Sequence, residues 1–159
     1  MLTLNLRLFF ALFIAFVLTI VPLPEIMTGL RPAWVLMLVL YIQFFLPDYF
    51  NITLLFFLGL CLDVLLSTVI GEHAFALVLT TWFASGKARR FNFFSIIQQM
   101  ALIALFCLVY QLNIYLIEAF VGYNPDLLMV VGPTLFSTLL WPWVGRALVQ
   151  GTFVAHGYL

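Results

Sequence analysis

Charge is scarce in this chain, which has six lysines and arginines and six aspartates and glutamates among 159 residues. Soluble globular proteins average about 25% charged and about 45–50% apolar residues, whereas this chain has 8% and 66%. A water-soluble fold of this length cannot hide so much apolar side chain. The shortage of charge therefore predicts an integral membrane protein, and a net charge of zero leaves no basic surface for nucleic acid.

Cysteine and histidine are almost as rare, which limits the chemistry available. Cys61 and Cys107 each lie alone within an apolar stretch, and the two histidines, His73 and His156, are far apart. Neither pair has the spacing of a disulfide framework or a metal site, and no serine occurs in a Gly-x-Ser-x-Gly setting. We therefore predict no metal, no cofactor and no catalytic residues.

Apolar residues form six runs, separated by short breaks that hold most of the charges and prolines. A membrane-spanning helix needs about 20 apolar residues, with a lower limit of about 17. The pattern predicts an all-α bundle of six transmembrane helices, with residues 1–159 forming one domain. The second and fourth runs are short, and removing both leaves a four-span alternative. The runs are 5–21, 33–46, 50–66, 72–86, 96–121 and 127–149.

The basic residues are distributed unequally between the two predicted sides of the membrane. Lysine and arginine concentrate in cytoplasmic loops of membrane proteins. With six spans, only Arg31 falls on the side opposite the N-terminus, so both termini are predicted to be cytoplasmic. The cluster Lys87, Arg89 and Arg90 is predicted to form a cytoplasmic basic loop that sets this topology and contacts anionic lipid.

Asp63 lies within an apolar run, where a carboxylate facing lipid is costly, so we expect it to point into the bundle. Gly59, Asp63 and Ser67 are spaced at helical intervals of four and are expected to share one face, with the glycine allowing close backbone approach. The hydrogen-bond partners of Asp63 are expected from polar side chains or free backbone groups, with the fifth and sixth runs as candidate sources. Two interpretations remain open: a buried site for a ligand or partner, and a hydrogen bond between helices.

Two further stripes of polar residues follow helical spacing. Gln111, Tyr115 and Glu118 fall at i, i+4 and i+7 in the fifth run, so they share a face directed inward or toward a partner. Thr134 and Ser137 belong to a similar stripe of small polar residues in the sixth run. Such stripes commonly form contacts between transmembrane helices.

An intramembrane protease is a third alternative. Asp63 and Asp126 lie toward the same predicted side of the membrane, where two carboxylates can share a proton and act as a catalytic dyad. Small lipoprotein signal peptidases have a similar length and use such a pair. Their motif contexts are absent here, and Asp126 sits in an Asn-Pro-Asp turn rather than in a span.

Four stretches together resemble one family. They are RPAWVLMLVLY at 31–41, GLCLDVLLSTVIGEHAFAL at 59–77, the basic cluster at 87–90 and LLWPW at 139–143. Their order and spacing resemble the MreD family of bacterial rod shape-determining membrane proteins. The resemblance implies a non-enzymatic inner-membrane subunit of the cell-elongation machinery that binds MreC, a single-span protein, and helps to organise peptidoglycan synthesis. The wider assembly would contain the MreB filament, RodZ, a SEDS-type glycan polymerase and a penicillin-binding transpeptidase.

The family resemblance also implies a fold similar to the substrate-binding membrane components of vitamin uptake transporters. A small-molecule-binding component of an uptake transporter is therefore the alternative function. A stoichiometric bound solute would favour the transporter, whereas a shape complex without solute would favour the elongation subunit.

Overall fold

The structure is a computed structural model that describes residues 2–21, 31–124 and 126–153. Within these ranges the chain forms six α-helices and one short 3-10 turn, with no strand, which confirms the all-α prediction. Asn51 and Ser95 cap two of the helices by accepting backbone N–H bonds with their side chains, as N-cap residues do. The elements are α1 (Leu2–Ile20), α2 (Trp34–Phe45), η2 (Pro47–Tyr49), α3 (Ile52–Leu66), α4 (Glu72–Phe91), α5 (Ile96–Val121) and α6 (Leu128–Phe153).

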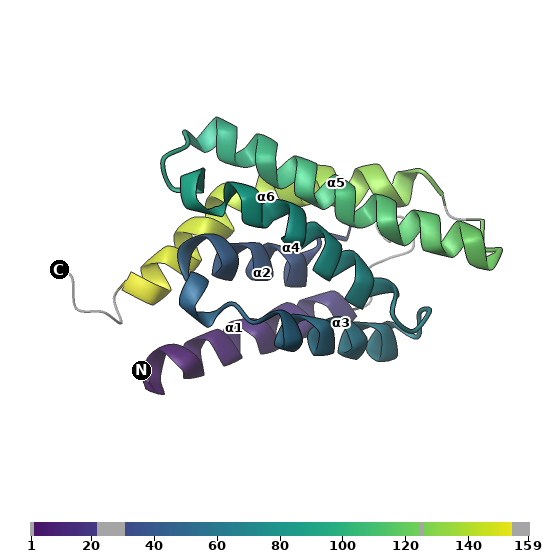
Figure 1. The fold of residues 1–159 in the computed structure, drawn as a ribbon, viewed down its shortest axis with the longest axis horizontal. Coiled ribbons are helices and arrows are strands. Elements are labelled where there is room, and N and C mark those ends of the chain that lie inside the picture. Colours follow the sequence, from purple (N-terminus) through teal and green to yellow (C-terminus); the bar gives the residue numbers. More distant parts are fainter. Residues whose placement is uncertain (1, 22–30, 125, 154–159) are drawn as a thin grey trace.

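The six helices run back and forth along the molecule (Figure 1). The start of α1 and the end of α6 therefore lie at the same end of the bundle, at the left of Figure 1, and the α4–α5 turn lies there too. The α3–α4 and α5–α6 connections lie at the opposite end. The main packing pairs are α5 with α6, α3 with α4, and α4 with α5.

Helix α2 lies at the centre of the bundle, in contact with α1, α4 and α6. Nine of its side chains are buried, and they cover the whole circumference of the helix, as expected for an element that is apolar all round. At 1.5 Å per residue its length is about 18 Å. The core thus forms around a short helix that the other helices cover.

The length and composition of each helix indicate whether it is long and apolar enough to span a bilayer. Among the described residues, only α5 and the Leu128–Leu148 part of α6 are both long and apolar enough to span. The apolar parts of α1, α2 and α3 are shorter, and α4 has 20 residues but ends in charged side chains. Length and composition therefore support two spans, and the six-span arrangement remains a prediction.

The basic cluster is helical, contrary to the prediction of a loop. Lys87, Arg89 and Arg90 are exposed and lie in the last turns of α4, which continues to Phe91. Lysine, alanine and arginine have high helix propensity, and cations are favourable near a helix C-terminus because of the helix dipole. These effects extend the helix beyond the end of the apolar run at residue 86.

Helices α3 and α4 come into backbone contact at Gly59. A Cβ atom placed on Gly59 would lie 2.6 Å from the backbone nitrogen of Ala74 and closer still to its Cα. Only glycine fits at this crossing, because any other side chain would overlap the backbone of α4. The close approach fixes the position of Asp63, one turn further along α3, relative to the start of α4.

Candidate functional site

Asp63 lies in the last turn of α3 and is fully buried. Its Oδ1 accepts hydrogen bonds from the backbone N–H of His73 at 2.8 Å and from Nδ1 of the same residue at 2.9 Å. Its Oδ2 accepts a hydrogen bond from the backbone N–H of Gly71 at 2.7 Å. The hydroxyl of Thr68 lies 3.5 Å from Oδ1 and 3.3 Å from the His73 ring nitrogen. Both carboxylate oxygens therefore face hydrogen-bond donors.

These contacts make Asp63 a cap for α4 that is supplied by the preceding helix. The first turn of a helix has N–H groups without carbonyl partners, and Gly71, the residue before α4, makes no side-chain cap. The Asp63 carboxylate accepts two of the N–H groups at this end, where the helix dipole also favours a negative charge. The buried acid is thus stabilised by the same contacts that hold the α3–α4 connection.

The expectation that Ser67 shares a face with Gly59 and Asp63 is wrong. Helix α3 ends at Leu66, and Ser67 is exposed and takes the left-handed conformation with φ of 54°. This C-terminal turn is closed by a hydrogen bond from the Thr68 N–H to the backbone carbonyl of Asp63. The stripe therefore stops at Asp63, because the chain turns back toward α4.

The source of the Asp63 hydrogen bonds also differs from expectation. The donors come from the α3–α4 connection and the first turn of α4, between five and ten residues further along the chain. The fifth and sixth helices supply none of these bonds. Asp63 therefore holds together a local hairpin rather than joining distant helices.

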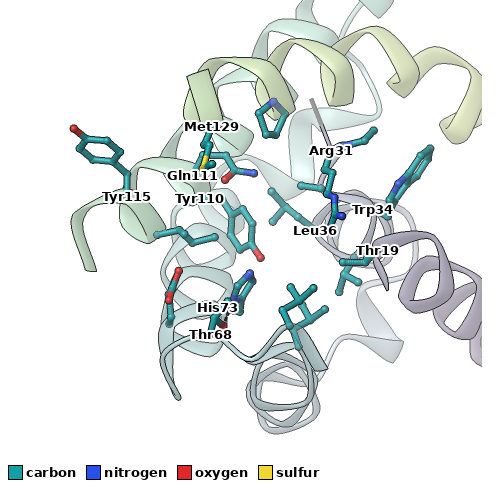
Figure 2. A pocket seen from close by; sticks show the side chains of 18 of the residues that line it. Thr19, Arg31, Trp34, Leu36, Thr68, His73, Tyr110, Gln111, Tyr115 and Met129 are labelled. Carbon is teal, nitrogen blue, oxygen red and sulfur yellow. Dashed lines mark hydrogen bonds between the residues drawn. The ribbon is translucent and has the colours of Figure 1, made fainter. Parts of the chain in front are cut away.

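A cavity of about 310 Å³, lined by both polar and apolar side chains, lies beside this cluster (Figure 2). It is bounded by the end of α1, the segment before α2 and the adjoining part of α2, the α3–α4 hairpin, α5 and the start of α6. Figure 2 shows the Tyr110 hydroxyl and the His73 ring on one side of the space and Arg31 on the other. The polar and charged residues among those that line it are Thr19, Arg31, Thr68, Glu72, His73, Tyr110, Gln111, Tyr115 and Glu118.

The predicted stripe of Gln111, Tyr115 and Glu118 lies along this cavity. All three residues are partly buried, and the ring of Tyr115 points away from the centre of the space (Figure 2). The stripe on α6 has a different environment: Ser137 is fully buried and accepts a hydrogen bond from the N–H of Ala33 at 2.9 Å. The α6 stripe therefore packs within the protein.

Glu72 and Arg31 are cavity residues that were not predicted from the sequence as site candidates. Glu72 is 1% exposed, and neither of its carboxylate oxygens has a hydrogen-bond partner among the described residues. The Nε atom of Arg31 is likewise buried without a partner there. Arg31 precedes the second apolar run and Glu72 begins the fourth, positions where charges usually face water, and only the packing of several helices places them at one cavity.

The structure does not bring Asp63 and Asp126 together as a dyad. Asp126 is exposed and accepts a hydrogen bond from the N–H of Leu128 at the start of α6, whereas the Asp63 carboxylate binds the α4 terminus. Within the described residues, no group of three His, Cys, Asp or Glu side chains is placed to hold a metal ion. The basic cluster lies at the end of α4 opposite Asp63, away from the cavity.

Comparison with known proteins identifies the family. No solved structure matches the chain. Residues 2–150 match the family described as rod shape-determining protein MreD. The rod shape-determining protein MreD of Haemophilus influenzae is 32% identical over 136 residues, which cover 82% of this chain and 81% of that protein. The chain therefore belongs to the MreD family of membrane proteins that determine rod shape.

Proposed function

We propose that this protein is a non-enzymatic inner-membrane subunit of the bacterial cell-elongation machinery, which binds an MreC-like single-span protein and helps to organise peptidoglycan synthesis. Membership of the MreD family carries the proposal, because the family has a role in cell shape. MreB, RodZ, the SEDS polymerase and the penicillin-binding transpeptidase would then be indirect partners.

The outward faces of the helices support binding within the membrane. Large apolar side chains such as Phe13 on α1, Phe57 on α3 and Leu105 on α5 are more than half exposed. The described part of the chain forms one helical bundle, so a partner would contact these faces or the short connections. The small polar stripe on α6 is already packed inside the bundle, which leaves it no surface for the partner.

We further propose that all six helices cross the membrane and that both termini are cytoplasmic. The alternating helix directions place the start of α1 and the basic end of α4 at the same end of the bundle (Figure 1), as the distribution of basic residues in membrane proteins favours. The short α2 does not contradict this, because a helix buried in protein at membrane depth does not have to match the bilayer thickness.

Labelling of single cysteines tests this topology. In a variant with Cys61→Ala and Cys107→Ala, a cysteine at Asn124 should react with a membrane-impermeant reagent added outside the cell, and a cysteine at Phe93 should react only after the membrane is opened. Both positions are exposed and lie in connections at opposite ends of the bundle. Reaction of the cysteine at Phe93 from outside would contradict the six-span topology.

Depletion and photocrosslinking test the function. Depletion should cause rod cells to become round, and a photoreactive residue at Phe13, Phe57 or Leu105 should crosslink to the MreC-like protein from at least one face. A matched residue at the buried position Leu40, which is 0% exposed, should not crosslink. Normal cell shape after depletion, together with no crosslink from any face, would refute the proposal.

The cavity favours one second candidate, the substrate-binding component of an uptake transporter. Its volume of about 310 Å³ lies at the lower end of the range for small-molecule sites. Under this alternative, depletion would leave cell shape unchanged and abolish uptake of one solute. The depletion experiment therefore separates the two functions.

A further inference from the structure

The cavity is lined by acidic and basic side chains that do not pair with one another. Glu72 lines the cavity, is 1% exposed and has no hydrogen-bond partner on either carboxylate oxygen within the described residues. Arg31 lines it from the side opposite the His73 ring and the Tyr110 hydroxyl (Figure 2), and its Nε atom has no partner within the described residues. No ion pair joins Arg31 to Glu72 or Glu118 across the described ranges, where the contact of this kind is the one between the His73 ring and the Asp63 carboxylate.

Buried charged groups without partners are costly, and in native proteins they are usually paired or hydrogen-bonded. The neighbouring Asp63 is a buried carboxylate with a structural role, and both of its oxygens accept hydrogen bonds. Glu72 is one residue away from these donors and shares none of them. Neither oxygen of its carboxylate has a partner at hydrogen-bond geometry among the described residues, and a bound molecule with N–H or O–H donors would supply one.

Arg31, on the opposite wall of the cavity, sets a second requirement for the ligand. Arg31 offers a guanidinium group, which favours phosphate or carboxylate oxygens as acceptors. A simple cation would satisfy Glu72 and Glu118 but would leave the buried Nε atom of Arg31 without an acceptor, and a simple anion would do the reverse. A molecule that carries both a positive and a negative charge can pair with the glutamates on one wall and with Arg31 on the other.

We propose that the cavity binds a small zwitterion, whose primary ammonium group lies at Glu72 and Glu118 and whose phosphate or carboxylate lies at Arg31. The ammonium must carry hydrogens, because a trimethylammonium group has no donor for the Glu72 oxygens. Two sources share this chemistry: the headgroup of a phosphatidylethanolamine lipid and a free water-soluble zwitterion. The proposal goes beyond the role in cell shape and does not depend on it.

Binding to the purified full-length protein tests the proposal. The probes are phosphoethanolamine and phosphocholine added to protein in detergent, and nanodiscs that contain phosphatidylethanolamine or only phosphatidylcholine. We expect the ethanolamine compound of at least one pair to raise the unfolding temperature, and the matching choline compound to have no effect. A shift with the lipid alone identifies a membrane ligand, whereas a shift with phosphoethanolamine alone identifies a soluble one.

Variants assign the effect to the cavity. Glu72→Gln and Arg31→Gln should each weaken binding at least tenfold, whereas Asp48→Asn and Arg89→Gln, which alter exposed residues distant from the cavity, should bind like the unaltered protein. Glu72→Gln should fold as well as the unaltered protein, because the carboxylate makes no hydrogen bond within the described bundle. Equal shifts with ethanolamine and choline compounds, no shift with any probe, or full binding by Glu72→Gln would each overturn the proposal.

Discussion

Substitution of Gly59 by alanine tests the packing of α3 against α4. The added Cβ would lie 2.6 Å from the backbone nitrogen and 2.9 Å from the Cβ of Ala74, where ordinary contacts begin at 3.4 Å. The two helices must therefore separate by about 1 Å, an overpacking that typically costs about 1–3 kcal/mol. The same movement lengthens the hydrogen bonds of Asp63 to Gly71 and His73, 2.7 and 2.8 Å long, and bonds to a charged group contribute about 1.5–3 kcal/mol.

Together these effects predict that Gly59→Ala lowers the free energy of unfolding by about 2.5–6 kcal/mol, and that the unfolding temperature falls by on the order of 10 °C for a chain of this length. Thermal unfolding in detergent, followed by tryptophan fluorescence, measures the shift. Gly86→Ala is the matched control, because a Cβ added to Gly86 in α4 would meet no atom within 4 Å and alanine favours a helix by about 0.5–1 kcal/mol. If both variants unfolded at the temperature of the unaltered protein, the close approach of the two backbones would be refuted.

Three further predictions use the same unfolding assay. Asp63→Asn should lower the free energy of unfolding by about 1–3 kcal/mol, because its NH₂ group must face an N–H donor at one of the two oxygen positions; stability equal to that of the unaltered protein would exclude the capping role. Gly71→Ala should cost about 1–2 kcal/mol, because Gly71 has φ of 98° and a side chain is strained in that region; a neutral effect would contradict this backbone conformation. Trp141→Ala should cost about 3–5 kcal/mol because the ring is buried, whereas Trp82→Ala, at a residue that is 66% exposed, should cost less than half as much.

The helices were largely predictable, because an apolar run long enough to enter a membrane is also a helix there. The predicted runs 50–66 and 96–121 correspond closely to α3 and α5. The boundaries were less predictable where charge was taken to mark a loop. At the end of α4, helix propensity and the helix dipole extend the helix through Arg90. The number of consecutive apolar residues, from which the runs were predicted, does not include these effects.

The candidate site was predictable only in part. The cost of a carboxylate in lipid is a property of one residue, and it correctly indicates that Asp63 turns inward. The partners of Asp63 depend on the left-handed turns at Ser67 and Gly71, which bring the start of α4 back to α3. The sequence does contain a signal for this contact. Gly71 precedes a helix that it cannot cap with a side chain, and Asp63, which lies eight residues earlier, can supply the cap.

The cavity could not be predicted in this way, because its walls come from segments that are distant in sequence. Arg31 and Glu72 are 41 positions apart in the numbering and meet the same cavity only through the packing of α2, α4 and α5. Taken alone, Arg31 and Glu72 each have the sequence context of a charged residue in a loop. Hydrophobic periodicity reports which side of a helix is buried, and it carries no information on which helices become neighbours.

Helix α2 lies at the centre of the bundle, and it is synthesised before most of the helices that cover it. Helix α2 leaves the ribosome after α1 and before α4 and α6, yet all three of these helices cover it. About 100 residues of chain therefore separate the synthesis of α2 from that of its last covering helix, α6. During this interval the side of α2 that α6 will cover must have another environment, and the central helix reaches its final packing only when synthesis is nearly complete.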